Sequence, residues 1–128
     1  MSLKTDDVTM ALLLKALDAA SLRHQAIASN LANANSPGYR ALRVNFEQQL
    51  GFARGALARA DGSLAAADVA GVSPRLEQAP PPRGGDAAVM VDMEMVRLAQ
   101  NTVQYQALLK GLSNRMSILA TAINEGRR

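Results

Sequence analysis

Each end of this 128-residue chain carries a long helical repeat, and these two repeats restrict the possible folds more than any other feature. Between residues 5 and 35, apolar or small side chains recur at alternating steps of three and four, which is the spacing of a heptad seam. The same spacing returns between residues 89 and 124, with Thr102 as its one polar position. A heptad seam is buried only against another helix. The pattern therefore predicts that the two helices pair and that the pair needs further partners.

The predicted helix-packing positions are the larger members of the two seams. In the first helix they are Met10, Leu13, Leu17, Ile27 and Leu31, and in the second they are Val91, Met95, Leu98, Tyr105, Leu109, Leu112, Met116, Leu119 and Ile123. His24 fills one slot of the first seam, where we expect an interface imidazole and not a catalytic one. Further apolar residues flank both seams. We therefore expect low stability of the isolated chain and ordering on assembly.

A firm stop follows the first helix. The run Ser36-Pro37-Gly38-Tyr39 predicts a type II turn, because proline fixes φ near −65° and glycine adopts positive φ at little cost. Proline also disfavours the helical conformation of the residue before it. We therefore expect the helix to end just before this run.

Composition divides the chain into three segments. Residues 1–50 hold the first helix, the turn and a short extended piece, and residues 89–128 hold the second helix. Residues 51–88 contain six of the nine glycines and four of the five prolines, which predicts a flexible Gly/Ala/Pro-rich connector. The predicted fold class is mainly α, with two long terminal helices pairing as a coiled-coil-like hairpin in one domain. An ordinary compact bundle stays an alternative, although such bundles more often use short loops.

Polar residues near the helix ends have structural interpretations. Thr5, Asp6 and Asp7 suit the N-cap and first turn of the first helix, where negative charge is favourable. Asp86 or Asp92 could cap the second helix. Asp92 and Glu94 lie two residues apart, so on a helix they diverge and are interpreted as first-turn charges, not as a catalytic pair.

Three asparagines fall within six residues at the end of the first helix. Asn35 suits the chemistry of a helix end and turn. Asn30 and Asn33 lie one helical turn apart, beside the seam. We expect their side-chain amides to bond to a neighbouring helix and so to fix its register.

Residue types that carry chemistry in other proteins are sparse. The chain has no cysteine, which excludes disulfides, Cys-ligated zinc and thiol catalysis, and it has a single histidine. Its net charge of +3 comes from scattered residues, not from a basic face. We therefore predict no catalytic, cofactor-binding or metal-binding residue, no enzyme activity, no small-molecule substrate and no nucleic-acid partner. No apolar run is long enough to span a membrane.

The run from Ala28 to Tyr39, ASNLANANSPGY, resembles the N-terminal signature shared by bacterial flagellar rod and hook proteins. That signature is a helix ending in Asn-rich small residues, followed by Thr/Ser-Pro-Gly-Tyr. The runs Asp92 to Leu109 and Ala122 to Arg127 are similar to the short proximal rod members of that family. The residues that match the motif and its turn are Asn30, Leu31, Asn33, Asn35, Ser36, Pro37, Gly38 and Tyr39.

The resemblance implies a structural subunit of the basal-body rod, whose terminal helices assemble into a helical tube that transmits motor torque. Its partners would be copies of itself, other rod proteins, and the membrane-ring and export-gate proteins at the rod base. The resemblance also implies a place in the periplasmic rod and export without a cleaved signal peptide. Two alternatives stay open: another short axial rod protein of the same family, and a cytosolic helix-binding adaptor or export chaperone.

Overall fold

The structure is a computed structural model that describes residues 2–51 and 66–127. Residues 52–65, which belong to the predicted connector 51–88, lie outside the described residues. Residues 47–51 are helical. The other elements, in chain order, are α1 (Ser2–Ala32), β1 (Leu42–Asn45), α3 (Ala66–Ala70), β2 (Arg75–Gln78) and α4 (Val91–Glu125).

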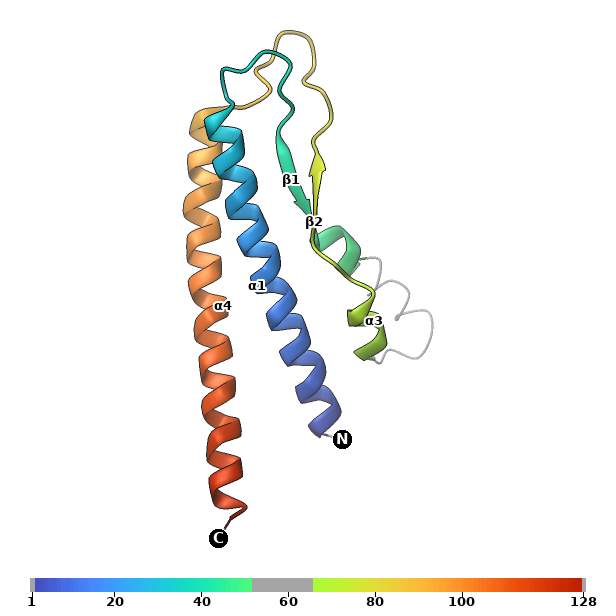
Figure 1. The fold of residues 1–128 in the computed structure, drawn as a ribbon, viewed down its shortest axis with the longest axis vertical. Coiled ribbons are helices and arrows are strands. Elements are labelled where there is room, and N and C mark those ends of the chain that lie inside the picture. The colour runs from blue at the N-terminus through green and yellow to red at the C-terminus, as the bar shows by residue number, and fades with distance from the viewer. Residues whose placement is uncertain (1, 52–65, 128) are drawn as a thin grey trace.

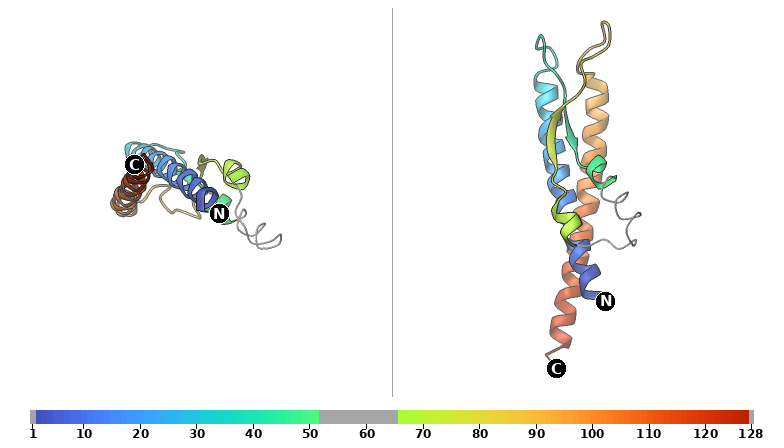
Figure 2. Two further views of the ribbon diagram at one scale, coloured as in Figure 1. Left: turned by 90° about the horizontal axis from the view of Figure 1, so that it is seen from below. Right: turned by 90° about the vertical axis from the view of Figure 1, so that its right-hand side faces the viewer.

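Two long helices form the body of the molecule. α1 has 31 residues and α4 has 35, so they are about 46 and 52 Å long. They run antiparallel and side by side, and α1 lies between α4 and the strand pair (Figures 1 and 2). The predicted fold class, a mainly α chain whose terminal helices pair as a hairpin, is confirmed.

The beginnings of both helices differ from the sequence expectation. α1 begins at Ser2, so Asp6 and Asp7 lie within the helix and not at its cap. Met90 is the N-cap of α4 and makes no side-chain cap bond, so neither Asp86 nor Asp92 caps this helix. Tertiary packing of a long helix outweighs the preference of individual residues for the cap position.

The predicted turn is present. The Tyr39 backbone N–H donates to the Ser36 carbonyl oxygen over 3.2 Å, which closes the four-residue turn. Gly38 has a φ of 74°, in the left-handed region that a type II turn requires at its third position. The turn sends the chain back along α1 toward β1 (Figure 1).

A short antiparallel strand pair covers part of the helix pair. β1 pairs with β2 from Leu42 opposite Gln78 to Asn45 opposite Arg75. The Ala79 N–H extends the pairing by donating to the Ala41 carbonyl oxygen over 2.7 Å. β1 lies where the sequence predicts an extended piece, but β2 lies within the segment predicted as a connector. Strands that are so short and so far apart in the sequence are difficult to predict as a pair, because the local sequence carries little information about the pairing.

The apolar core is small and rich in alanine. Ala19 of α1 packs with Phe46 and Val72, and all three are buried. Because alanine has a small side chain, the chain after β1 and the chain after α3 approach the α1 backbone closely. Lys15 of α1 donates from Nζ to the carbonyl oxygens of Ala70 (3.3 Å) and Val72, which fixes the end of α3 against α1.

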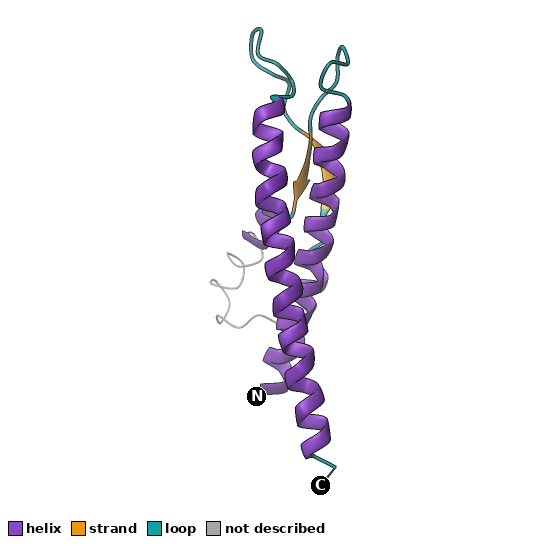
Figure 3. Ribbon diagram, turned by 90° about the vertical axis from the view of Figure 1, so that its left-hand side faces the viewer, coloured by secondary structure: helices purple, strands orange, loops and turns teal. Residues whose placement is uncertain are grey.

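The last turns of α4 have no helix beside them. The free ends of α1 and α4 diverge, and α4 extends past the N-terminus of α1 (Figures 1 and 3). Every side chain from residue 116 to 127 is exposed. The hairpin is therefore held together near the turn and open at the other end.

The turn yields a direct test of backbone strain. Gly38→Ala should lower the free energy of unfolding by about 1–2 kcal/mol, because an L-residue is strained at this positive φ although no atom lies within 4 Å of the added Cβ. Gly51→Ala is the matched control, since Gly51 lies in a helical stretch and also has open space. Urea unfolding followed by circular dichroism measures both. Equal effects of the two substitutions would contradict this account of the turn.

Candidate assembly site

One carboxylate is fully buried where the start of α4 meets the end of α1. Glu94 has none of its surface exposed. Its Oε1 accepts bonds from Arg43 of β1 and from Arg97 of α4, each over 2.6 Å. Its Oε2 accepts a bond from Asn30 of α1 over 3.1 Å. Three elements therefore converge on one side chain, and we call Asn30, Tyr39, Arg43, Glu94 and Arg97 the polar cluster.

Asn30 is the second centre of the polar cluster and is also fully buried. Its Oδ1 accepts the backbone N–H of Leu42 (2.8 Å) and the hydroxyl of Tyr39 (2.9 Å). Its Nδ2 donates to the Leu42 carbonyl oxygen (3.0 Å) as well as to Glu94. The amide thus bonds to the backbone N–H and C=O of one β1 residue, Leu42, as a neighbouring strand would, while it also bonds to α4. The predicted amide bond from Asn30 to a neighbouring helix is present.

The other two asparagines act locally. Asn33 donates from Nδ2 to the Ser29 carbonyl oxygen of its own helix over 2.9 Å, so the predicted bond from Asn33 to a neighbouring helix is wrong. Its Oδ1 accepts the Ser36 hydroxyl over 3.4 Å, which links the helix end to the turn. Asn35 is exposed within the turn. Asn33 therefore contributes the turn chemistry that the sequence assigned to Asn35.

The electrostatics of the polar cluster favour a charged Glu94. Burial acts to raise the pKa of Glu94, but hydrogen bonds from Asn30, Arg43 and Arg97, with the charge of Arg43, outweigh it and lower the pKa below its ordinary value of 4.5. A buried carboxylate is stable only when such partners satisfy it. Glu94 is therefore an ionised part of the hairpin interface.

Two polar positions on α4 were not recognised in the sequence. Glu94 lies in the first turn of α4, as predicted, but its burial in the hairpin interface was not predicted, whereas its neighbour Asp92 is exposed. Asn101 is buried and donates from Nδ2 to the Ala20 carbonyl oxygen of α1 over 2.9 Å. Glu94, Leu98 and Asn101 follow one another along α4 at steps of four and three, as the residues of the apolar seam do, but two of these three are polar. In the structure, Glu94 and Asn101 face α1 and bond to it.

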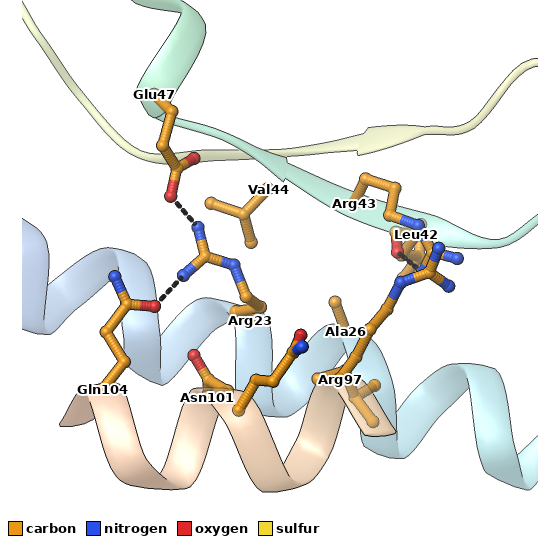
Figure 4. A pocket seen from close by; sticks show the side chains of 11 residues that line it. Arg23, Ala26, Leu42, Arg43, Val44, Glu47, Arg97, Asn101 and Gln104 are labelled. Carbon is orange, nitrogen blue, oxygen red and sulfur yellow. Dashed lines mark hydrogen bonds and ion pairs between the residues drawn. The ribbon is translucent and has the colours of Figure 1, made fainter. Parts of the chain in front are cut away.

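A side chain of α1 links three elements in a neighbouring groove of about 330 Å³ (Figure 4). Arg23 donates to Glu47, which follows β1, over 2.5 Å, and to Gln104 of α4 over 3.4 Å. Because the Glu47 side chain is largely exposed, this ion pair adds little stability. Its main effect is to orient residues 47–51 toward the helix pair.

The predicted helix-packing positions divide into two groups. In α1, Ile27 is buried and Met10, Leu13, Leu17 and Leu31 are half-buried; in α4, Leu98 and Leu112 are half-buried. The rest of the α4 seam is exposed and is here called the assembly stripe: Val91, Met95, Tyr105, Leu109, Met116, Leu119 and Ile123. Packing within one chain therefore leaves most of the apolar seam of α4 uncovered.

The assembly stripe borders a hollow between the two long helices, here called the helix groove. It has a volume of about 510 Å³ and is lined by Ala20, Ser21, His24, Asn101, Thr102, Tyr105, Gln106 and Leu109. His24 is exposed there. Within residues 2–51 and 66–127, no group of three or more acidic or histidine side chains could hold a metal ion, and no helix is both long and apolar enough to cross a bilayer. The site offers surfaces for contact.

Comparison with known proteins finds similarity to one family. The profile of flagella basal body rod proteins matches residues 11–40, which include Asn30 and the turn. The chain is 28% identical over 119 residues to the flagellar basal body rod protein FlgB of Bacillus subtilis, covering 88% of this chain and 90% of that protein. It is 29% identical over 115 residues to FlgB of Aeromonas hydrophila, covering 84% and 86%. The chain is similar to flagellar basal body rod proteins, and the profile and both relatives support a FlgB-type rod protein.

This similarity supports a structural role in the rod of the basal body and assembly with other rod components. This rod family is not an enzyme family. The matched range contains two of the five residues of the polar cluster, Asn30 and Tyr39. The family motif therefore corresponds to the joint between the helices and β1.

The polar cluster predicts a large effect of a small change. Glu94→Gln keeps the size of the side chain but leaves Arg43 and Arg97 facing a neutral amide, and should lower the free energy of unfolding by roughly 2–3 kcal/mol. Asp92→Asn, on the exposed side of the same helical turn, should change it by less than about 1 kcal/mol. Urea unfolding at neutral pH compares the two. A Glu94→Gln variant as stable as Asp92→Asn would show that the cluster does not stabilise the fold.

The lowered pKa of Glu94 also predicts how stability depends on pH. A lowered folded-state pKa contributes stability that is complete above the unfolded-state value of 4.5 and is lost as pH falls toward the folded-state pKa. The stability difference between the wild-type chain and Glu94→Gln should therefore be largest at neutral pH and should shrink below about pH 4.5. Urea unfolding between about pH 3 and 7 measures it. A difference that stays constant across this range would contradict an ionised Glu94.

Proposed function

We propose that this chain is the FlgB-type subunit of the proximal rod and that it assembles through its terminal helices into a helical tube that transmits motor torque. The observation that carries the proposal is the assembly stripe. Its seven large apolar side chains lie exposed along α4 over a length on the order of 50 Å. A stripe of this kind on a structural protein is suited to burial against other helices.

The polar cluster supports the torque-bearing part of the proposal. A subunit that transmits torque needs a fixed internal geometry, because a loose hairpin would absorb strain by sliding. The bonds of Glu94 to Asn30 and Arg43 fix the axial register of α1 against α4 and attach β1 to both. Polar groups that are satisfied in only one arrangement specify register more sharply than apolar contacts do. The cluster therefore holds the assembly stripe in one position relative to the turn and the strand pair.

We propose the following partners and location for the chain. Its neighbours are copies of itself and other rod proteins, and at the base of the rod the membrane-ring and export-gate proteins. It reaches the periplasmic rod through the flagellar export route without signal cleavage. The names of the two relatives, both flagellar basal body rod protein FlgB, support the rod itself as the site of assembly. The ring, the gate and the export route are inferred from the resemblance of the motif.

A charge on the assembly stripe should prevent assembly. In the bacterium that encodes the chain, replacement of its gene by the Leu109→Asp variant should abolish swimming and leave no complete basal bodies. The reason is that Leu109 is an apolar member of the stripe, 43% exposed before assembly, and a carboxylate there would be buried without a partner. Swimming in soft agar and electron microscopy of purified basal bodies measure the effect.

Lys110→Asp is the matched control for this experiment. It places the same carboxylate on the next residue, at an exposed position that already carries a charge and lies outside the stripe. These cells should swim. Normal swimming by cells with Leu109→Asp would refute the proposed role of the stripe, and equal loss with both variants would show an effect of charge alone.

A further inference from the structure

The last turns of α4 before Glu125 are exposed and carry no charge on any face. The nine residues from Met116 to Asn124, here called the overhang, contain no acidic or basic side chain, and all of them are exposed. Ile118 and Ile123 are 65% and 60% exposed. Surface helices normally carry charge on the face turned to water, and helices that lack it are normally enclosed. The overhang is therefore suited to burial on more than one side.

One hydroxyl group of the overhang, that of Thr121, and one of the helix groove, that of Thr102, are already hydrogen-bonded within α4. Thr121 donates from Oγ1 to the Ser117 carbonyl oxygen of its own helix over 3.0 Å. A hydroxyl that is already bonded costs much less to remove from water than one that loses its partner. Thr102, at the wall of the helix groove, bonds to the Leu98 carbonyl oxygen in the same way. The hydroxyl groups of Thr121 and Thr102 can therefore be removed from water without losing their bonds.

The helix groove matches the overhang in chemistry. None of its eight lining residues is an aspartate, glutamate, lysine or arginine. Ala20, Ser21 and His24 form the wall on α1. The wall on α4 combines Tyr105 and Leu109 with the uncharged polar residues Asn101, Thr102 and Gln106. A charged segment placed there would lose hydration without gaining an ion pair. An uncharged helix such as the overhang would gain apolar contact at no such cost.

The two surfaces cannot meet within one chain. The middle of the groove on α4 lies near Tyr105 and the middle of the overhang near Ala120, so about 22 Å of rigid helix separates them. They are also different surfaces of the same chain. When one surface of a subunit binds a different surface of the next, the contact is heterologous and repeats without limit unless a rotation closes it into a ring.

We propose that the overhang of one copy lies in the helix groove of a neighbouring copy, displaced along the helix axis by about 22 Å. This inference rests on the proposed function and adds the identity of the two mating surfaces. The occupant is a second copy of this chain, because the chain itself supplies an uncharged, unpartnered helix end that matches an uncharged groove. Each copy uses its own groove and its own overhang, so addition of subunits has a direction.

Two variants that each disable one surface test the proposal. Ser21→Arg puts a charged side chain at the wall of the groove and leaves the overhang intact. Leu119→Asp puts a charge on the overhang and leaves the groove intact. Sedimentation velocity of the purified full-length chain should show open-ended oligomers for the wild type. Each variant alone should associate at least about tenfold more weakly.

The mixture of the two variants gives the decisive result. The intact overhang of Ser21→Arg can enter the intact groove of Leu119→Asp, but neither remaining surface can continue the chain. An equimolar mixture should therefore form a one-to-one complex that does not grow. Lys110→Asp, which changes the charge outside both surfaces, should oligomerise as the wild type does. Circular dichroism checks that each variant keeps its helices.

Disulfide cross-linking provides a readout that does not depend on weakened variants. The chain has no cysteine, so Ser21→Cys and Ser117→Cys each introduce a single thiol. Oxidation of the two mixed variants should give a cross-linked heterodimer in larger yield than either variant alone, because the groove of one copy faces the overhang of another.

Three outcomes would overturn the inference. They are a closed wild-type dimer, a wild-type chain that stays monomeric, and a variant mixture that does not associate. None of these outcomes contradicts the proposed function, which is tested separately by the loss of swimming with Leu109→Asp. If Ser21→Arg also stops swimming while the purified chain stays monomeric, the groove holds another rod component and self-docking is refuted.

Discussion

The structure depends on the bond between the Asn30 amide and the Glu94 carboxylate. Removing a carboxylate from water costs several kcal/mol unless partners replace the lost hydration. Here Asn30, Arg43 and Arg97 supply them, and Asn30 is in turn held by the backbone N–H and C=O of Leu42 in β1. The end of α1, the start of α4 and β1 are therefore fixed together. Any shift of one helix along the other would leave a buried charge without its bonds.

This arrangement determines which faces of the helices remain available. Because Glu94 and Asn101 must face α1 to be satisfied, α4 is rotated so that most of its larger apolar residues point away from its partner. The internal interface thus consists largely of alanines and bonded polar groups, and the external surface carries Met95, Leu109 and Met116. The polar cluster has two effects, since it holds the hairpin together and it keeps the apolar seam free. A hairpin that buried the seam within itself would be a better monomer and a poorer subunit.

Part of this could be predicted from the sequence, and the reasons for success and failure are physical. The two helices follow from a heptad period sustained over more than twenty residues, and the turn follows from the conformational limits of Pro37 and Gly38. The orientation of α4 does not follow, because the steps through Glu94, Leu98, Asn101 and Tyr105 obey the same alternation of four and three as the apolar seam. Hydrophobicity alone favours burial of the apolar seam of α4. Only Asn30 and Arg43, which are distant in the sequence, favour burial of the face that carries Glu94. The pairing of β1 with β2 was missed for a similar reason, since four-residue strands acquire their preference from the neighbours that tertiary structure provides.

The two ends of the hairpin differ, because the polar cluster fixes the end near the turn and the other end is open. The polar cluster fixes α1 and α4 near the turn, whereas their free ends diverge (Figure 1). α4 then extends beyond α1 as an uncharged helix, while the helix groove lies about 22 Å nearer the turn. A chain whose two uncharged surfaces coincided would close into a dimer and stop. The offset is a length of α4 itself, and the polar cluster holds the α1 wall of the groove beside α4. An offset between two complementary surfaces is the condition under which identical subunits add indefinitely in one direction.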